Sequence, residues 1–316
     1  MVQRSIYSIL MMVWSGISLA VTDEVRDSVQ LPDIEISTTR YARPPQQIQQ
    51  QVSILNPMML RERHILSPKD ITAYIPNLLM PDYGSAMTSS VYVRGLGSRI
   101  DQPVVGIVVD GVPLLDKNMY DHHTTDIRRI EFLRGPQGTM YGRNTSGGLL
   151  EIHTLQPLDV SSVHVRAEVG YSTANTVQTA ASVYVPHTPD FGYGISARYG
   201  RTDGFYTNSY SGKKVDAGQD VNARWVMDWQ PDDHWRVTNT VTFDWVQQGA
   251  FPYASVESNR IAYNDETSYR RWVLRDGLKA LYQRDGYKLQ IVGSYQFLGD
   301  RMLMDQDYTI APIFTL

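Results

Sequence analysis

The sequence contains no cysteine, no long apolar stretch after its N-terminus and no marked excess of either charge. Without thiols the chain cannot form disulfides, which is compatible with an oxidising compartment but does not identify one. No internal run of 18 apolar residues occurs, so the interior of the chain contains no transmembrane α-helix. If the chain crosses a membrane, it must do so as a β-barrel. A formal charge of −4 over 316 residues gives no indication of a nucleic-acid partner.

The N-terminus has the pattern of an export signal. Arg4 precedes an almost wholly apolar or small-residue stretch over residues 5–19. Ser18-Leu19-Ala20 fits a cleavage site of the small-x-small type. The stretch is shorter than the roughly 20 residues that a transmembrane helix needs. We therefore predict a cleaved signal peptide over residues 1–20.

Residues 21–50 are polar, carry two adjacent prolines and contain a glutamine-rich run, so we predict a flexible segment. One short piece within it, residues 31–37, alternates between apolar and polar side chains. A strand in a flexible arm has unpaired backbone groups and can add to the sheet edge of another protein. The alternative is that this piece is simply the first strand of the following domain.

Residues 51–157 have the mixed signals of a compact α+β domain. Short helices are predicted over residues 57–64 and 68–74, with Ser67 as the N-cap of the second. Strands are predicted over residues 91–94, 104–109, 127–133 and 149–154. A glycine-rich loop separates the last two strands.

From residue 158 to residue 316 the sequence becomes a series of alternating apolar and polar segments. The segments are residues 163–171, 177–185, 193–199, 221–229, 237–245, 272–282 and 287–297. One-sided alternation over about ten residues is typical of a transmembrane β-strand. A soluble β-sandwich is the alternative, but its strands are usually about five or six residues long. Aromatic residues at the segment ends and an alternation of short and long connections also favour the membrane barrel; the short first connection, residues 172–175, is an exception.

Four ordered motifs carry the sharpest signal. Their members are Arg94, Gly95, Asp110, Gly111, Glu131, Arg134, Gly135, Pro136, Tyr141, Gly142, Gly147 and Gly148. In this order and spacing they closely resemble the plug domain of TonB-dependent outer-membrane receptors. The resemblance implies an α+β plug domain followed by antiparallel transmembrane β-barrel strands. About seven strands are present of the roughly 22 that the family implies, and the barrel is thus incomplete.

Other interpretations of the same glycines are not supported. Gly95-Leu96-Gly97 lacks the third glycine of a dinucleotide-binding motif, since Ile100 stands in its place, and no phosphate-binding loop follows any glycine run. The resemblance implies that Arg94, Glu131 and Arg134 pair within the plug or with acidic groups on the inner barrel wall. The alternative is a set of ordinary surface salt bridges, which contribute little individually.

The resemblance also assigns the short alternating piece near the N-terminus. It places the TonB box, the strand that the energy-coupling protein TonB binds, at Pro32, Asp33, Ile34, Glu35, Ile36 and Ser37. The implied function is TonB-dependent import of a scarce solute, most often a ferric siderophore, across the Gram-negative outer membrane. The implied partners are TonB, the solute and outer-membrane lipid, and we expect a monomer without a cofactor. The alternatives are a cobalamin or oligosaccharide importer, or a plug fragment that binds TonB without transport.

No catalytic site and no metal site are predicted. Asp121-His122-His123 with Asp126 offers metal-binding side chains, but adjacent histidines in a polar loop usually form a solvated turn. In the family that the sequence resembles, outward plug loops contact the ligand. Residues 116–125 and 81–89 are therefore candidates for ligand contact.

Seven strands is an odd number and lies below the minimum of about eight in bacterial barrels. An open sheet edge in lipid leaves backbone groups unpaired. On the sequence alone we therefore expect that these residues are part of a longer receptor or a truncated product.

Overall fold

The computed structural model describes residues 51–311 except 88–89, 99–101 and 256–258. The predicted signal peptide, the flexible segment and the TonB box at residues 32–37 lie outside the described residues. Among those described, no helix has the length and apolar character needed to span a membrane.

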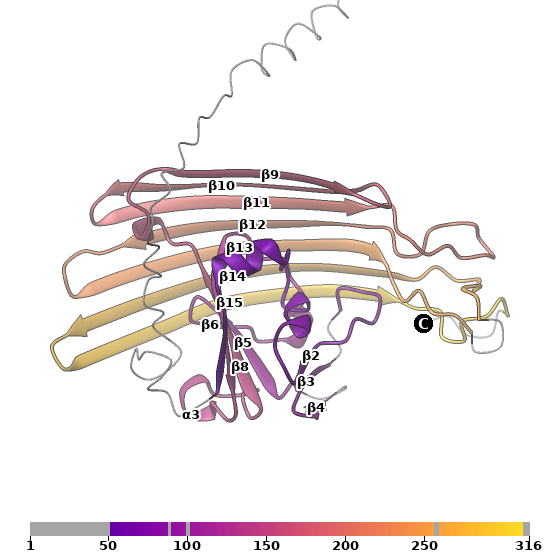
Figure 1. Cartoon of the computed structure of the whole chain (residues 1–316), viewed down its shortest axis with the longest axis horizontal. Coiled ribbons are helices and arrows are strands. Elements are labelled where there is room, and N and C mark those ends of the chain that lie inside the picture. The colour runs from indigo at the N-terminus through magenta and orange to yellow at the C-terminus, as the bar shows by residue number, and fades with distance from the viewer. Residues whose placement is uncertain (1–50, 88–89, 99–101, 256–258, 312–316) are drawn as a thin grey trace, which may run out of the picture. The chain divides into compact units, whose positions relative to one another are not determined.

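Residues 51–157, here called the α+β region, contain a mixed five-stranded sheet in the order β1-β7-β8-β5-β6 (Figure 1). Its strands are β1 (Val52–Leu55), β5 (Val105–Val109), β6 (Val112–Pro113), β7 (Ile127–Arg134) and β8 (Gly148–Thr154). β5 and β8 are parallel and the other pairs are antiparallel. A smaller sheet joins β2 (Leu78–Leu79), β3 (Val91–Val93) and β4 (Leu96–Ser98). Buried Ile107, Phe132 and Ile152 belong to the core between these elements.

The helices of this region are short. α2 (Pro57–Glu62) begins where the Asn56 side chain accepts a hydrogen bond from the Met59 amide. The others are η2 (Asp70–Ala73), η3 (Lys117–Met119), α3 (Gly138–Tyr141) and η4 (Pro157–Asp159).

The second helix differs from its prediction over residues 68–74. It begins at Asp70 as a single 3-10 turn, and Ser67 is not its N-cap. The Asp70 carboxylate instead accepts hydrogen bonds from the amides of Leu66 and Ser67. The Asp70 side chain thus stabilises the turn formed by the residues before it, and the helix begins after that turn, at Asp70 itself.

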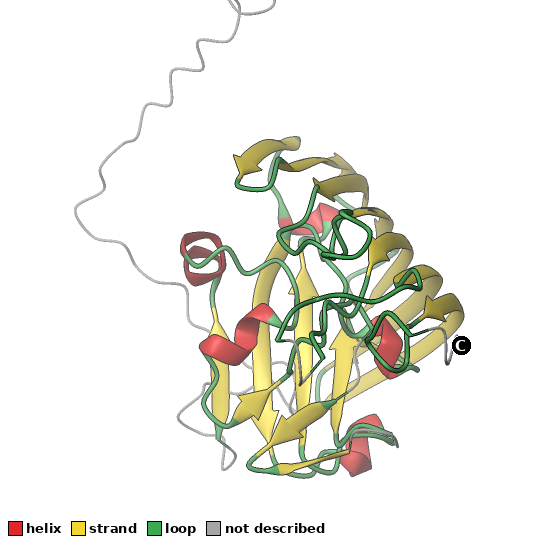
Figure 2. Cartoon of the chain, turned by 90° about the vertical axis from the view of Figure 1, so that its right-hand side faces the viewer, coloured by secondary structure: helices red, strands yellow, loops and turns green. Residues whose placement is uncertain are grey.

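The seven predicted long strands are confirmed and form one antiparallel sheet in sequence order, here called the long-stranded sheet (Figure 1). They are β9 (His164–Ser172), β10 (Thr176–Thr188), β11 (Phe191–Thr202), β12 (Gly218–Trp229), β13 (Trp235–Gly249), β14 (Ser268–Arg284) and β15 (Tyr287–Leu303). Figure 2 shows that these strands form a curved layer. The tight turns after β10, β12 and β14 lie at one end, and the long connection 203–217 and the described residues of the connection after β13 (250–255 and 259–267) lie at the other.

Burial along the long strands is the reverse of that in a soluble sheet. On β11 the apolar side chains of Tyr193 and Ile195 are exposed, whereas Ser196 and Arg198 are buried. On β14 Trp272 and Leu274 are exposed and Arg271 is buried. An apolar face without protein cover needs a hydrocarbon environment, which supports the barrel and argues against the soluble sandwich. Exposed Tyr171, Tyr199 and Trp229 near strand ends fit an aromatic belt at the interface.

The α+β region packs closely against the polar face of this sheet. At Gly277 of β14 an added Cβ atom would lie 2.7 Å from the Cγ2 atom of Val112 in β6. Glycine at this position therefore allows the two backbones to approach.

We predict that Gly277→Ala destabilises this contact by about 1 to 3 kcal/mol, because the β-branched Val112 cannot move aside freely. Thermal unfolding in detergent would show a lower midpoint. Gly293→Ala on β15 is the matched control, since no heavy atom beyond the glycine's own neighbours lies within 4 Å of a Cβ atom there. Equal midpoints for the two variants would contradict the close approach.

Candidate functional site

The Asp110-Gly111 motif makes the turn between β5 and β6. Both residues have positive φ, 52° and 88°, which favours glycine at the second position. The Asp110 carboxylate accepts hydrogen bonds from the Thr154 amide at 2.8 Å and from the Thr154 hydroxyl at 2.6 Å. Arg224 of β12 reaches the same carboxylate at 3.5 Å. Asp110 thus joins the ends of two motif strands to the long-stranded sheet.

The charge of Asp110 is favoured despite its burial. Burial alone would raise the pKa of this carboxyl. The Arg224 guanidinium, the Lys279 ammonium and the two hydrogen bonds from Thr154 outweigh it and hold the pKa of Asp110 below its usual value.

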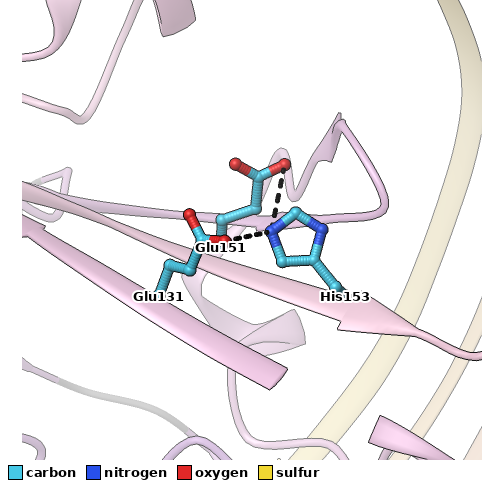
Figure 3. Close-up of side chains that lie close together, drawn as sticks. All are labelled: Glu131, Glu151 and His153. Atoms are coloured by element: carbon cyan, nitrogen blue, oxygen red, sulfur yellow. Dashed lines mark ion pairs between the residues drawn. The ribbon is translucent and has the colours of Figure 1, made fainter. Parts of the chain in front are cut away.

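Glu131 lies in a buried polar cluster on β7 and β8, shown in Figure 3. It is paired directly across the sheet with Glu151, and His153 Nε2 lies 3.3 Å from Glu131 and 3.9 Å from Glu151. Arg129 Nε donates to Glu131 at 2.6 Å, and the Tyr141 hydroxyl donates to Glu151 at 3.3 Å. Burial and the neighbouring Glu131 raise the pKa of Glu151, although His153 opposes the shift.

This cluster is the group of side chains, among the described residues, that has a composition able to hold a metal ion. Two carboxylates and an imidazole fit such an ion in principle, but Arg129 and Tyr141 already bind the carboxylates. The prediction of no metal site stays a prediction. Glu131 and Tyr141 were predicted from the sequence as motif residues, but their proximity to Glu151 and His153 was not.

The glycine-rich motif forms a closed loop between β7 and β8. The Gly135 amide donates to the Gly147 carbonyl at 2.9 Å. A Cβ atom on Gly148 would lie 2.8 Å from the Leu133 carbonyl oxygen, so any larger residue would separate the strands. The remaining members occupy this loop and the β3–β4 turn: Pro136 is exposed, Gly142 follows α3 with positive φ, and Gly95 turns the chain with positive φ.

Arg94, Glu131 and Arg134 contact residues of the α+β region. Arg94 donates to the Gln51 side chain at 3.1 Å, and Arg134 donates to the Pro76 carbonyl at 3.1 Å. Burial of Glu131 and Arg134 contradicts the alternative of ordinary surface salt bridges for these two residues.

Many contacts between the α+β region and the long-stranded sheet are made by sheet arginines, which pair with aspartates or donate to carbonyls. Arg166 pairs with Asp126 at 3.1 Å, and Arg224 donates to the Leu155 carbonyl at 3.3 Å. These residues were not among those predicted from the sequence. Their signal was present, since arginines recur on the polar side of the alternating strands, but their partners could not be read from spacing.

Arg271 of β14 makes the densest of these contacts. Its side chain is fully buried. Nη1 donates to the carbonyls of Ala86 at 3.1 Å and Asn118 at 2.7 Å. Nη2 donates to the Asp121 carbonyl at 2.7 Å and to the Asp244 carboxylate at 2.7 Å.

A cavity of about 590 Å³ lies between the α+β region and the long-stranded sheet. Ala86, Asp121 and Arg271 contribute to its lining, together with Tyr206 and Pro252 from the long connections. Its charged groups are largely paired with one another, as in Lys69 with Asp121 at 2.8 Å. The volume suits a small-molecule ligand.

Comparison with known proteins decides the family of this region. Residues 44–149 match the family model described as TonB-dependent Receptor Plug Domain. The pesticin receptor of Yersinia pestis is 36% identical over 100 residues, which is 31% of this chain and 15% of that protein. The chain carries a TonB-dependent receptor plug domain. The α+β region is this plug, and the long-stranded sheet is the wall of barrel strands.

Solved structures confirm the combined fold. The ferric yersiniabactin uptake receptor of Yersinia pestis superposes with a TM-score of 0.73 at 20% identity, over 81% of this chain and 42% of that one. The ferripyoverdine receptor of the outer membrane of Pseudomonas aeruginosa gives 0.70 at 14% identity, over 88% and 38%. At such identities the likeness shows the fold alone. With the plug match, it assigns the chain to the Gram-negative outer membrane.

The chain spans only part of its relatives. It covers 15% of the pesticin receptor and 30% of the ferrioxamine B receptor of Salmonella typhimurium, to which it is 22% identical over 229 residues.

The plug segment with adjacent histidines is not the predicted solvated turn. His122 is buried, and its Nδ1–H donates to the Met119 carbonyl at 2.8 Å. Burial and the nearby guanidinium groups of Arg275 and Arg271 hold the pKa of His122 well below its usual value. The polar surroundings in the sequence gave no sign that two arginines of the long-stranded sheet lie near His122.

The candidate metal ligands of this segment have other partners. Asp126 pairs with Arg166 and accepts a hydrogen bond from the Tyr184 hydroxyl at 2.9 Å. His123 lies 3.4 Å from Asp220. Ligand contact by residues 116–125 and 81–89 stays a prediction, and Asp121 and Ala86 line the cavity.

We predict that Asp110→Asn destabilises the seated plug at pH 7 by about 1 to 3 kcal/mol, because a charged acceptor of the Thr154 hydrogen bonds is lost. Asparagine adopts positive φ readily, so the turn itself is kept.

The lowered pKa of Asp110 sets the pH dependence of this effect. The stabilisation is fully present above the unfolded pKa, about 3.9, and is lost as the pH falls through the lower folded value. Thermal midpoints in detergent should therefore differ between Asp110→Asn and the unmodified protein at pH 7, and converge in strong acid. A difference that grows below pH 4 would contradict this assignment.

Proposed function

We propose that this chain supplies the plug and barrel strands of a receptor that imports a ferric siderophore across the outer membrane with energy from TonB. The observation that carries this proposal is the cavity between plug and wall at the end of the long connections. Its lining combines plug loops that are hydrogen-bonded to the wall with residues of the long connections. A ligand bound there contacts both parts that must separate during import.

Support for a ferric siderophore comes from the proteins to which the chain is similar. They include the ferrioxamine B receptor, the ferric yersiniabactin uptake receptor and the ferripyoverdine receptor. A vitamin B12 transporter of Photobacterium profundum is 23% identical over 206 residues, so cobalamin is the second candidate.

The mechanism follows from the polar contacts between plug and wall. Import requires a path through the lumen, so contacts such as those of Arg166, Arg224 and Arg271 must be broken on one side of the plug. In water each broken contact is replaced by hydration, which keeps the net cost of a hydrogen bond to a charged group at about 1.5 to 3 kcal/mol. The proposed TonB box at residues 32–37 would pair as a strand with the sheet edge of TonB. A pull on this strand, driven by the inner-membrane proton gradient, would move the plug.

Uptake by cells tests the proposed substrate. A strain lacking the gene would be complemented with the complete gene that contains this sequence. Ferric yersiniabactin, ferrioxamine B and ferripyoverdine, each labelled with radioactive iron, would be offered alongside labelled cyanocobalamin. We expect accumulation of at least one ferric chelate in tonB⁺ cells and none in tonB⁻ cells. Accumulation of cyanocobalamin alone would support the second candidate instead.

We also predict that a disulfide between plug and wall blocks transport. The hydroxyl oxygens of Thr125 in the plug and Ser196 in β11 lie 2.6 Å apart, so sulfur atoms at both positions can bond. Residues 1–316 contain no cysteine, so Thr125→Cys with Ser196→Cys introduces the only thiol pair in this part of the receptor. The oxidised variant should bind ligand but not import it, and a reductant should restore uptake.

Thr125→Cys alone is the control and should import under both conditions. Uptake at the unmodified rate by a fully cross-linked double variant would show that this part of the plug does not leave the wall during transport.

A further inference from the structure

We propose that Arg271 is a positioning residue. It holds two plug loops that contribute to the lining of the 590 Å³ cavity in the arrangement that binds ligand. The first loop is residues 81–87 and the second loop is residues 114–126. This inference rests on the proposed function, because it assigns a specific task within the same site.

The contacts of Arg271 join both loops to one point of the wall. Ala86 belongs to the first loop, and Asn118 and Asp121 belong to the second; all three accept through backbone carbonyls. Hydrogen bonds from a guanidinium are charge-assisted and therefore stronger than neutral ones. The planar guanidinium has donors at fixed angles, so it sets the relative positions of the carbonyls as well as their distance from the wall.

Asp244 of β13 makes this arrangement possible. Its carboxylate accepts from Arg271 at 2.7 Å, and both side chains are buried. A buried guanidinium without a paired carboxylate would be costly. Because Asp244 supplies the compensating charge from the wall itself, the plug needs to offer only neutral carbonyls, which it can release without leaving an unpaired charge behind.

Within the plug, Lys69 ties the same two loops to each other. Its ammonium donates to the Ser85 carbonyl at 2.9 Å and pairs with the Asp121 carboxylate at 2.8 Å. Lys69 therefore links the two loops to each other, and the hydrogen bonds of Arg271 link both of them to the wall. Arg271, Ala86 and Asp121 all line the cavity. A ligand in the cavity thus contacts the loops at the place where they are fastened.

Other contacts each reach one loop. In the first loop, the Gly84 carbonyl accepts a hydrogen bond from the Phe251 amide at 3.1 Å, in the connection after β13. In the second loop, the Asn118 side chain donates to Asp300 of β15 at 3.1 Å. Arg224 donates to the Leu155 carbonyl and the Tyr184 hydroxyl, away from both loops. Gln296 contacts Pro113 and Leu115, at the start of the second loop, through its amide. Arg271 joins both loops.

The experiment compares Arg271→Lys with Arg270→Lys in the complete receptor. Lysine keeps the charge beside Asp244 but cannot span three carbonyls with one planar group. Arg270 is the neighbouring arginine on β14 and is exposed, so its replacement controls for the chemistry of the change.

The first measurement is hydrogen exchange of the ligand-free receptor in detergent. We expect faster amide exchange in both loops for Arg271→Lys, with unchanged exchange in β5 as proof that the plug remains folded. Arg270→Lys should match the unmodified protein. Unchanged exchange in both loops of Arg271→Lys would overturn the proposal, whichever ligand the receptor takes.

The second measurement is uptake of radioactive ferric yersiniabactin over a range of concentrations. We expect the half-saturating concentration for Arg271→Lys to rise about tenfold, equivalent to about 1.4 kcal/mol, with little change in maximal rate per receptor. A fall in maximal rate at unchanged half-saturation would overturn the positioning role, because it indicates a defect in transport or assembly. If the unmodified receptor imports no ferric chelate, the proposed substrate is wrong, and hydrogen exchange still decides the role of Arg271.

Discussion

The structure depends on one constraint, which is that the inward face of β11 to β14 is polar and largely buried. Charged side chains such as Arg224 and Arg271 cannot remain unpaired away from water without a cost of several kcal/mol. Wall carboxylates and plug groups together supply the partners. The plug thus completes the hydrogen bonding of the wall, and the wall fixes the position of the plug. Apolar side chains of the outward face, such as Ile195, Trp272 and Leu274, need no such partner because they belong in lipid.

The same constraint explains how a firmly held plug can move. The contacts across the interface are polar, often between a guanidinium and a carbonyl, as at Asn118 and Asp121. Water can replace such contacts at modest net cost once it enters the lumen. The apolar core inside the plug, which includes Ile107 and Phe132, has no such substitute and would lose its stabilisation in water. In water, the interface between plug and wall is therefore easier to separate than the plug core, and this interface is the one that must open during import.

Much of this architecture could be predicted from local sequence pattern. Alternation of Tyr193 and Ile195 with Ser196 and Arg198 predicts a strand with one apolar face, and the structure confirms it. The site was less predictable. Asp110 and Thr154 meet only because β5 and β8 are parallel neighbours. Arg271 binds backbone carbonyls, which have no signature in sequence. The surroundings of His122 were misread because the charged Arg271 and Arg275 near it lie on β14, far along the chain.

The orientation of the wall strands tests the central claim most directly. Because residues 1–316 contain no cysteine, Ile195→Cys or Ser196→Cys introduces the only thiol in this part of the receptor. In the membrane-embedded receptor, a fluorophore at position 195 should be quenched by a lipid-bound quencher. The thiol at position 196 should react slowly with an aqueous maleimide while the plug is seated, since Ser196 is buried. Lipid quenching at position 196, with protection at position 195, would contradict the account.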